Sequence, residues 1–171
     1  MWIMLYRLFD RIATWPMVAL LFSIFVLCSG GFNWRSKRLG CENPVLDARF
    51  WYSPGQARDF FKAIDKEGRR IYAISQVTLD LVFPLTYGAL FGALIVHVYA
   101  QNIARLLVWV PVLTAITDLL ENVTTAFLAW QFDDRASPLA WVAAVFTAVK
   151  TVLFGVGLVL IVLGAIRLIG H

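Results

Sequence analysis

The chain has 171 residues, of which 60% are hydrophobic, and its mean hydropathy is +0.74. This excludes a water-soluble globular domain, which is only roughly half apolar. The formal net charge of +4 would suit nucleic-acid binding in a soluble protein, but nine of the fifteen basic residues lie between positions 35 and 70. A basic segment beside membrane spans favours anionic lipid headgroups. We therefore expect membrane lipids as partners, and no nucleic acid.

Uncharged stretches alternate with short charged ones, and this pattern predicts four membrane-spanning helices. Each stretch reaches the ~20 residues that cross ~30 Å of hydrocarbon at ~1.5 Å per residue. We expect an all-α, integral membrane four-helix bundle, a single domain over residues 1–171, in a bacterial inner membrane. The predicted spans are about 12–29, 71–100, 106–131 and 138–168, with an extramembrane connection over 30–70.

The first predicted span carries no charge, so we expect it to be the helix that faces lipid most. The N-terminal segment has the charged-then-apolar form of a signal peptide, but three more spans follow, which favours its retention. The two cysteines, Cys28 and Cys41, should lie on one side of the membrane. There they pair if the compartment is oxidising, and otherwise serve as packing and loop residues.

The sequence leaves the orientation open. Counting basic residues places the connection 30–70 in the cytoplasm, because nine lie in it and Arg135 lies on the same side. Arg7 and Arg11 precede the first span, which favours a cytoplasmic N-terminus and so the opposite orientation.

Within the connection, the sequence predicts a short amphipathic helix. Ser53 fits the N-cap, Pro54 the first helical position, and Gln56 the closing residue of a capping box, while Gly68 fits a C-terminal stop. An apolar face recurs at helical spacing, at Ala57, Phe60, Phe61 and Ile64. The pattern predicts a helix on the membrane surface, although packing over the ends of the spans would give the same periodicity.

The second predicted span contains a carboxylate and a proline one turn apart. Pro84 cannot donate a hydrogen bond to the carbonyl of Asp80, so that residue offers both a carboxylate and a freed backbone oxygen. Thr78, a neighbouring helix or water could satisfy this oxygen. Tyr87 lies on the same face and could donate to the carboxylate through a bridge. Gly88 and Gly92 form a small-xxx-small pair suited to close helix contact.

The third predicted span carries a polar stripe. At 100° per residue its members share one face: Thr114, Asp118, Glu121, Asn122 and Thr125. An ionised group at mid-span costs about 2.5 to 3.5 kcal/mol on insertion scales. Two carboxylates one turn apart also repel each other, so we expect a proton or a cation to match at least one of them.

Lys150, in the fourth predicted span, can supply that cation. It lies as far after the turn near Asp134 as Asp118 lies before it, so an antiparallel hairpin brings the two to similar depth. The face of Lys150 also carries small residues, which allow membrane helices to approach closely: Ala143, Thr147, Gly157 and Gly164. We expect Lys150 to face the bundle and to pair with Asp118 or Glu121.

Together these residues define a predicted polar seam between the second, third and fourth spans. Its members are Asp80, Tyr87, Thr114, Asp118, Glu121, Asn122, Thr125 and Lys150. We expect no metal and no cofactor, because the chain has two separated histidines, His97 and His171, and no HExxH, CxxC, P-loop or dinucleotide-binding motif. We expect His97 to be a packing or interface residue.

Three motifs carry a resemblance to known proteins: Gly68 to Tyr72 (GRRIY), Asp80 to Pro84 (DLVFP) and Asp118 to Asn122 (DLLEN). Over about positions 68 to 150 the chain resembles a group of small four-span membrane proteins without an established activity. The resemblance implies the topology and no particular function. The chain lacks the motifs that surround the paired aspartates of lipoprotein signal peptidases, so that activity is not inferred.

The polar seam supports several functional hypotheses. The first is a non-enzymatic protein that binds a lipid, a small molecule or a partner helix through the seam. The second is an intramembrane enzyme acting on a lipid-borne substrate, with Asp80 or Asp118 as general acid or base and Lys150 stabilising negative charge. The third is proton- or ion-coupled transport, which would require a homo-oligomer. A purely structural role, in which the charges fix helix register, also stays open.

Overall fold

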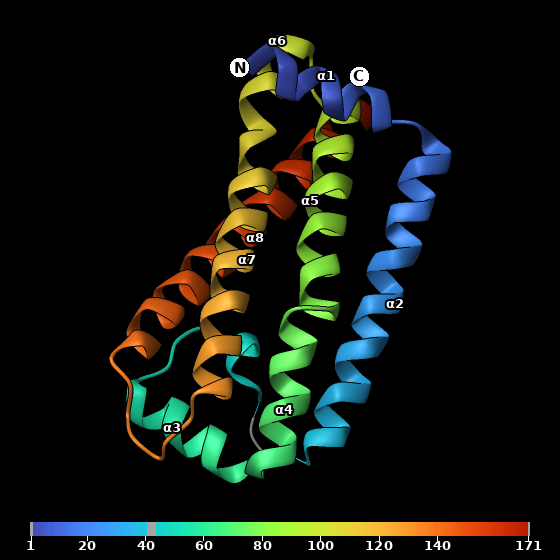
Figure 1. Ribbon diagram of the computed structural model, residues 1–171. Coiled ribbons are helices and arrows are strands. Elements are labelled where there is room, and N and C mark those ends of the chain that lie inside the picture. Colours follow the sequence, from blue (N-terminus) through green and yellow to red (C-terminus); the bar gives the residue numbers. More distant parts are fainter. Residues whose placement is uncertain (1, 41–43, 171) are drawn as a thin grey trace.

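The computed structural model describes residues 2–40 and 44–170, and every regular element in these ranges is a helix, which confirms the all-α prediction (Figure 1). In chain order the elements are α1 (Trp2–Ile12), α2 (Trp15–Leu39), the 3-10 turn η1 (Leu46–Ala48), α3 (Pro54–Ala63), α4 (Asp65–Gln76), α5 (Leu79–Val98), α6 (Gln101–Leu107), α7 (Trp109–Trp130) and α8 (Leu139–Ile169).

Four helical segments are long and apolar enough to cross a membrane, as the sequence predicts. They are α2, the pair α4 and α5, the pair α6 and α7, and α8. Even α2, with 25 residues, exceeds the ~30 Å thickness of a hydrocarbon core at ~1.5 Å per residue. The four-helix bundle is therefore confirmed, although the second and third segments each contain a break that the sequence does not predict.

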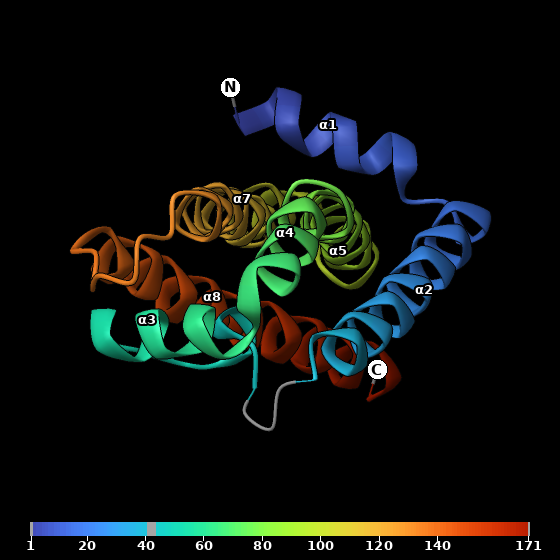
Figure 2. The same cartoon turned by 60° about the horizontal axis from the view of Figure 1, so that its bottom comes forward.

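The long helices α2, α5 and α7 lie side by side, and α8 packs against both α7 and α5. α7 packs along α8 and also against α5, while α5 packs against α2 on its other side. α8 crosses the bundle obliquely behind α5 and α7 (Figure 1). In the second view α2 lies at one edge and the α7–α8 turn at the other (Figure 2). α3 lies at the end of the bundle opposite to the termini (Figure 1).

The helix of the first span continues beyond the predicted end of that span. The sequence favours an end near Ser29, but α2 continues to Leu39 and stops at Gly40, which has a left-handed φ of 62°. Glycine adopts this conformation without steric penalty, so it is the effective helix terminator here. Gly31 instead lies inside α2, where a Cβ would come 3.0 Å from the side chain of Leu79. The connection is consequently shorter than predicted.

α1 is an additional helix that the sequence analysis does not predict. It lies across the end of the bundle where both termini are found (Figure 1). Phe9 is only 6% exposed and packs on α5, where a Cβ on Gly92 would lie 2.2 Å from its ring. Gly88, the other member of the predicted glycine pair, faces Ala115 of α7 instead. The pair therefore serves two different contacts.

The predicted start of the helix in the connection is confirmed and its predicted stop is wrong. The Ser53 hydroxyl accepts a hydrogen bond from the Gln56 amide at 3.2 Å, and the Gln56 side chain accepts one from the Ser53 amide at 2.8 Å. The chain turns at Asp65, whose φ is 54°, and the Asp65 carboxylate accepts a hydrogen bond from the Gly68 amide. Asp tolerates this backbone conformation, so α4 begins here with Gly68 inside it.

The apolar face of α3 is buried over the ends of the spans. Four residues form this face and are at most 4% exposed: Ala57, Phe60, Phe61 and Ile64. Phe60 and Phe61 both pack edge-on against Tyr72 of α4. Of the two interpretations left open by the periodicity, packing against the bundle therefore accounts for the apolar face.

Candidate functional site

The polar stripe of α7 lies inside the bundle, as predicted. Its five residues are each at most 5% exposed: Thr114, Asp118, Glu121, Asn122 and Thr125. The hydroxyls of Thr114 and Thr125 donate to carbonyls one turn earlier in α7, at 2.8 and 3.0 Å. Both threonines thus share the face without bonding to another helix through these hydroxyls. The carboxylates and the asparagine amide reach across to α5 and α8.

Lys150 forms ion pairs with both carboxylates of α7, which confirms the predicted pairing. Its Nζ lies 2.9 Å from Asp118 Oδ1 and 2.6 Å from Glu121 Oε2, and its side chain is 15% exposed. The Thr147 hydroxyl, one turn earlier in α8, donates to Glu121 Oε1 at 2.6 Å. The Tyr87 hydroxyl of α5 donates to Asp118 Oδ2 at 3.0 Å. We refer to these five residues as the lysine cluster.

Tyr87 differs from the prediction in its partner. The sequence suggests a bridged contact with Asp80, which lies on the same face of α5. The structure shows that Tyr87 bonds directly to Asp118 instead, because α7 packs closely on this part of α5. The Asp80 carboxylate has another partner, which the sequence analysis does not place inside the bundle.

That partner is Arg35, near the end of α2. Its guanidinium is 2% exposed and lies 2.5 Å from Asp80 Oδ2 and 2.6 Å from Asp47 Oδ2 in η1. The Tyr72 hydroxyl of α4 donates to Asp47 Oδ1 at 3.2 Å, and the Ser75 hydroxyl accepts from Arg35 at 3.1 Å. The guanidinium also lies 5.4 Å from the centre of the Tyr72 ring. We refer to these five residues as the arginine cluster.

Sequence reasoning misses Arg35 and Asp47 because both fall in the predicted extramembrane connection. A signal is nevertheless present: Cys28, Arg35 and Leu39 follow one another at spacings of seven and four, and all three are buried on one face of α2. Asp47 leaves no comparable periodicity, because its position depends on how η1 inserts between the helices.

Asp47 is held as an anion. Burial tends to raise the pKa of its carboxyl, but the positive charges of Arg35 and Lys150 outweigh this effect, and the pKa falls below its ordinary value of 3.8. The influence of Lys150 on Asp47 also indicates that the lysine and arginine clusters interact electrostatically. The two clusters are therefore parts of one charged interior.

Asn122 joins the two clusters. Its side-chain amide donates a hydrogen bond to the backbone carbonyl of Asp80 at 2.5 Å. This is the carbonyl that Pro84 leaves without a donor in its own helix. Of the three partners considered from the sequence, a neighbouring helix is the one observed, and the bond ties α7 to α5 beside Glu121.

Several buried polar atoms beside the clusters have no hydrogen-bond partner among the described residues. They are both amide atoms of Gln76, the Tyr52 hydroxyl, which lies close to the Thr147 hydroxyl without hydrogen-bond geometry, and Asn122 Oδ1. Gln76 is 1% exposed and lies one turn after Tyr72 on the same face of α4, and Tyr52 is fully buried. Burial raises the pKa of Tyr52, so its hydroxyl stays protonated. We refer to these three residues and the two clusters together as the buried network.

The charges of the buried network do not balance. It contains four carboxylates, on Asp47, Asp80, Asp118 and Glu121, against the two cations Arg35 and Lys150. With all six ionised the network is formally −2, which is unfavourable in a medium of low dielectric constant. A further positive charge, or protons, would restore the balance.

His97 is a packing residue, as predicted. Its ring stacks on Trp15 at the start of α2, with centroids 4.6 Å apart and an angle of 12° between the planes. Trp15 itself is 68% exposed, as expected for a residue at a membrane interface. In the part of the chain that the structure describes, no group of three or more His, Cys, Asp and Glu residues could hold a metal ion.

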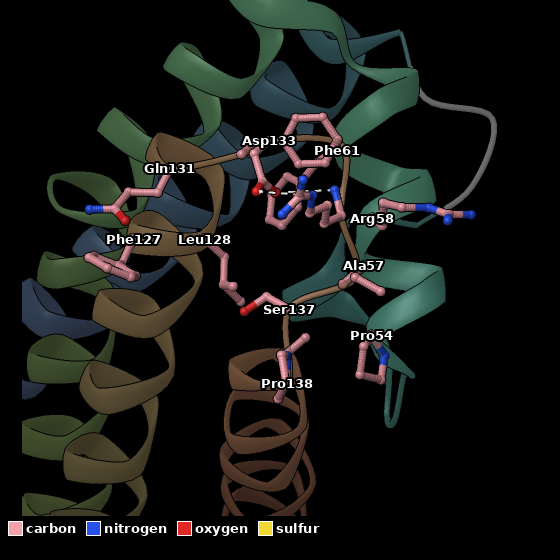
Figure 3. A pocket seen from close by; sticks show the side chains of 14 residues that line it. Pro54, Ala57, Arg58, Phe61, Phe127, Leu128, Gln131, Asp133, Ser137 and Pro138 are labelled. Carbon is pink, nitrogen blue, oxygen red and sulfur yellow. Dashed lines mark hydrogen bonds and ion pairs between the residues drawn. The ribbon is translucent and has the colours of Figure 1, made fainter.

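A separate cavity of about 340 Å³ lies between α3 and the turn that joins α7 to α8 (Figure 3). Ala57 and Phe61 line it from α3, Leu128 from α7, and Ser137 and Pro138 from the turn. None of the charged residues of the buried network lines it.

Comparison with known proteins found no matching family model, no matching curated protein and no matching solved structure. The suggested pairing of Cys28 with Cys41 cannot be compared with the structure, because Cys41 lies outside the described residues. Cys28 is buried in α2.

Proposed function

We propose that the chain is an integral membrane protein of a bacterial inner membrane that binds an ammonium-bearing small molecule or lipid headgroup in the buried network. One observation carries this proposal. Buried polar atoms without protein partners lie beside an interior that has more carboxylates than cations. A buried polar group without a partner costs about 1 to 3 kcal/mol, so a molecule that satisfies these atoms gains binding free energy.

The chemistry of the unpartnered atoms indicates what kind of group fits. Gln76 Oε1 and Asn122 Oδ1 accept hydrogen bonds, and the Tyr52 hydroxyl can both accept and donate. Gln76 Nε2 donates, so the ligand should carry an acceptor, such as the hydroxyl of ethanolamine, beside its ammonium group. An ammonium group donates up to three hydrogen bonds and adds positive charge to a network with excess carboxylate. An anionic ligand would instead add to the repulsion among the four carboxylates.

Binding is favoured over acid-base catalysis by the state of the candidate aspartates. Both oxygens of Asp118 are engaged, one by Lys150 and the other by Tyr87. Asp80 is engaged by Arg35 through its carboxylate and by Asn122 through its carbonyl. A general base needs a lone pair directed at a substrate, and both oxygens of Asp118 and one carboxylate oxygen of Asp80 already accept hydrogen bonds.

The test measures thermal stability of the purified protein in a non-ionic detergent, which contains no ammonium group. Free ethanolamine and phosphatidylethanolamine supply the ammonium group from two sources, and ethylene glycol and diacylglycerol, which has no headgroup charge, serve as probes without it. We expect at least one ammonium source to stabilise the protein and neither other probe to do so. Stabilisation by free ethanolamine identifies a small-molecule site, and stabilisation by the lipid alone identifies a headgroup site.

Two variants locate the binding. Gln76→Leu and Tyr52→Phe remove unpartnered atoms without touching an ion pair, so they should abolish the stabilisation. Gln131→Leu and Tyr6→Phe make the same chemical changes outside the buried network and should retain it. If no ammonium probe stabilises the parent protein, or if Gln76→Leu and Tyr52→Phe respond as the parent does, the proposal is wrong.

A further inference from the structure

A basic pocket and an apolar groove meet on the outer face of α4 and α7, away from the buried network. The pocket, of about 540 Å³, is lined by Lys66, Arg69 and Arg70 at the start of α4 and by Trp130 at the end of α7. The groove, of about 260 Å³, is lined by apolar residues one to two turns further along α4, and Trp130 lines it as well. Because Trp130 lines both hollows, they lie next to each other.

The order of the two hollows follows the direction of the spans. α4 begins at the end of the bundle opposite to the termini and runs towards its middle. α7 packs beside α4 and runs in the opposite direction, so that it finishes at the same end (Figure 1). From Arg70 to Val77 the helix rises roughly 10 Å at ~1.5 Å per residue. Positive charge therefore lies at the end of the bundle, and the apolar part lies deeper, at the level of the spans.

The basic residues are available to a ligand. Lys66 and Arg70 are exposed and have no ion-pair partner among the described residues. The Arg69 guanidinium stacks 4.5 Å from the centre of the Phe132 ring and donates to the Phe61 carbonyl, which fixes its position. Glu67 also lines the pocket, so three cations face one carboxylate there and the pocket carries a net positive charge.

The apolar groove is open to its surroundings. Four of its lining residues are substantially exposed: Ile74 at 47%, Val77 at 51%, Phe127 at 49% and Trp130 at 74%. Apolar residues in this position would be solvated poorly by water and well by an acyl chain. The aromatic ring of Trp130, at the junction, has the location that indoles prefer between headgroups and hydrocarbon.

From this arrangement we propose that the groove between α4 and α7 binds one anionic phospholipid. Its phosphate contacts Lys66 and Arg70, and one acyl chain lies along Ile74, Val77 and Phe127. Charge complementarity selects an anionic headgroup over a zwitterionic one, because a basic residue near an anionic headgroup contributes about 1 kcal/mol. The site is independent of the ammonium-binding function proposed for the interior.

Native mass spectrometry of the detergent-purified protein, titrated with phosphatidylglycerol or phosphatidylcholine of equal chain length, tests this site. We expect one phosphatidylglycerol to be retained in preference to phosphatidylcholine. Lys66→Gln/Arg70→Gln should weaken its binding roughly tenfold to thirtyfold. Trp130→Ala should also weaken it, because both hollows lose a wall.

The matched control is Lys37→Gln/Arg38→Gln, which removes two exposed basic residues from α2 near the same end of the bundle. This variant should bind phosphatidylglycerol as the parent does. Equal weakening in the two double variants would show a nonspecific charge effect and overturn the proposal. So would equal retention of the two lipids by the parent protein, or unchanged binding in both Lys66→Gln/Arg70→Gln and Trp130→Ala.

Discussion

Asn122 of α7 donates a hydrogen bond to the backbone carbonyl of Asp80, the carbonyl that Pro84 deprives of its helical donor. The bond places the two cation-centred clusters side by side, since Asp80 also binds Arg35 and the neighbour of Asn122 in the chain, Glu121, binds Lys150. A side chain of α7 thus replaces the backbone hydrogen bond that α5 lacks.

The contribution of this hydrogen bond to stability can be measured with a double-mutant cycle. Asn122→Ala leaves the Asp80 carbonyl unsatisfied and should destabilise the protein by about 1 to 3 kcal/mol. Pro84→Ala restores an amide that can donate to the same carbonyl, so in the Pro84→Ala background Asn122→Ala should cost much less. Unfolding free energies in detergent provide the four values. Additive effects would show that the two residues do not share this carbonyl.

Removing the charge of Lys150 should be strongly destabilising. Lys150→Met leaves Asp118 and Glu121 buried and uncompensated, which should lower the unfolding free energy by about 3 to 5 kcal/mol. Because Lys150 contacts both carboxylates, Asp118→Asn/Lys150→Met should recover only part of this loss, and the triple variant that adds Glu121→Gln should recover most of it.

The control for Lys150 is Lys62→Met, which breaks the exposed ion pair with Asp134. Exposed pairs contribute at most about 1 kcal/mol, so this variant should unfold nearly as the parent does. Equal losses in Lys150→Met and Lys62→Met would contradict the buried location of the lysine cluster.

Arg35 should not be replaceable by lysine. Separate nitrogens of its guanidinium contact Asp47 and Asp80, and a single ammonium group on a flexible chain cannot reproduce this fork. Arg35→Lys should therefore lower the unfolding free energy by about 1.5 to 3 kcal/mol, the range of one hydrogen bond to a charged group. Arg38→Lys, at an exposed position of the same helix, should have almost no effect. Comparable losses at both positions would contradict the two separate contacts of the Arg35 guanidinium.

The lowered pKa of Asp47 predicts an acid-sensitive contribution to stability. Its carboxyl faces Arg35 from α2, Tyr72 from α4 and Lys150 from α8, and its pKa falls below 3.8 in the folded protein. A lowered pKa stabilises the folded state fully above the unfolded value, and this stabilisation is lost as the pH falls through the folded value. Asp47→Asn should therefore be less stable than the parent at pH 7, and the difference should shrink below about pH 3.8. A pH-independent difference would contradict this.

The sequence was sufficient to predict the features that follow from the cost of placing charged groups in hydrocarbon. Hydropathy predicts the four spans, and the cost of a buried charge predicts that Lys150 faces the bundle and pairs with Asp118 or Glu121. Helix geometry alone places the polar stripe of α7 on one face. These features are encoded locally, in the spacing of residues along a helix or in the depth of a residue from a turn.

The arginine cluster could not be predicted in the same way. The first predicted span ends near position 29, although α2 continues to Leu39, and this places Arg35 in the predicted connection. Asp47 reaches the interior only because η1 inserts between helices that are distant in sequence. The choice of Asp118 rather than Asp80 as the partner of Tyr87 likewise depends on how α5 and α7 pack. Such contacts are set by tertiary packing, which the spacing of residues along one helix does not encode.

A density map of the protein in a native-lipid nanodisc, at a resolution that shows side chains, tests the proposed binding in the buried network most directly. We expect Lys150 between Asp118 and Glu121, with further density within hydrogen-bond distance of Gln76, Tyr52 and Asn122. A map in which Lys150 points to lipid, or in which Gln76, Tyr52 and Asn122 bond only to one another, would contradict the proposal.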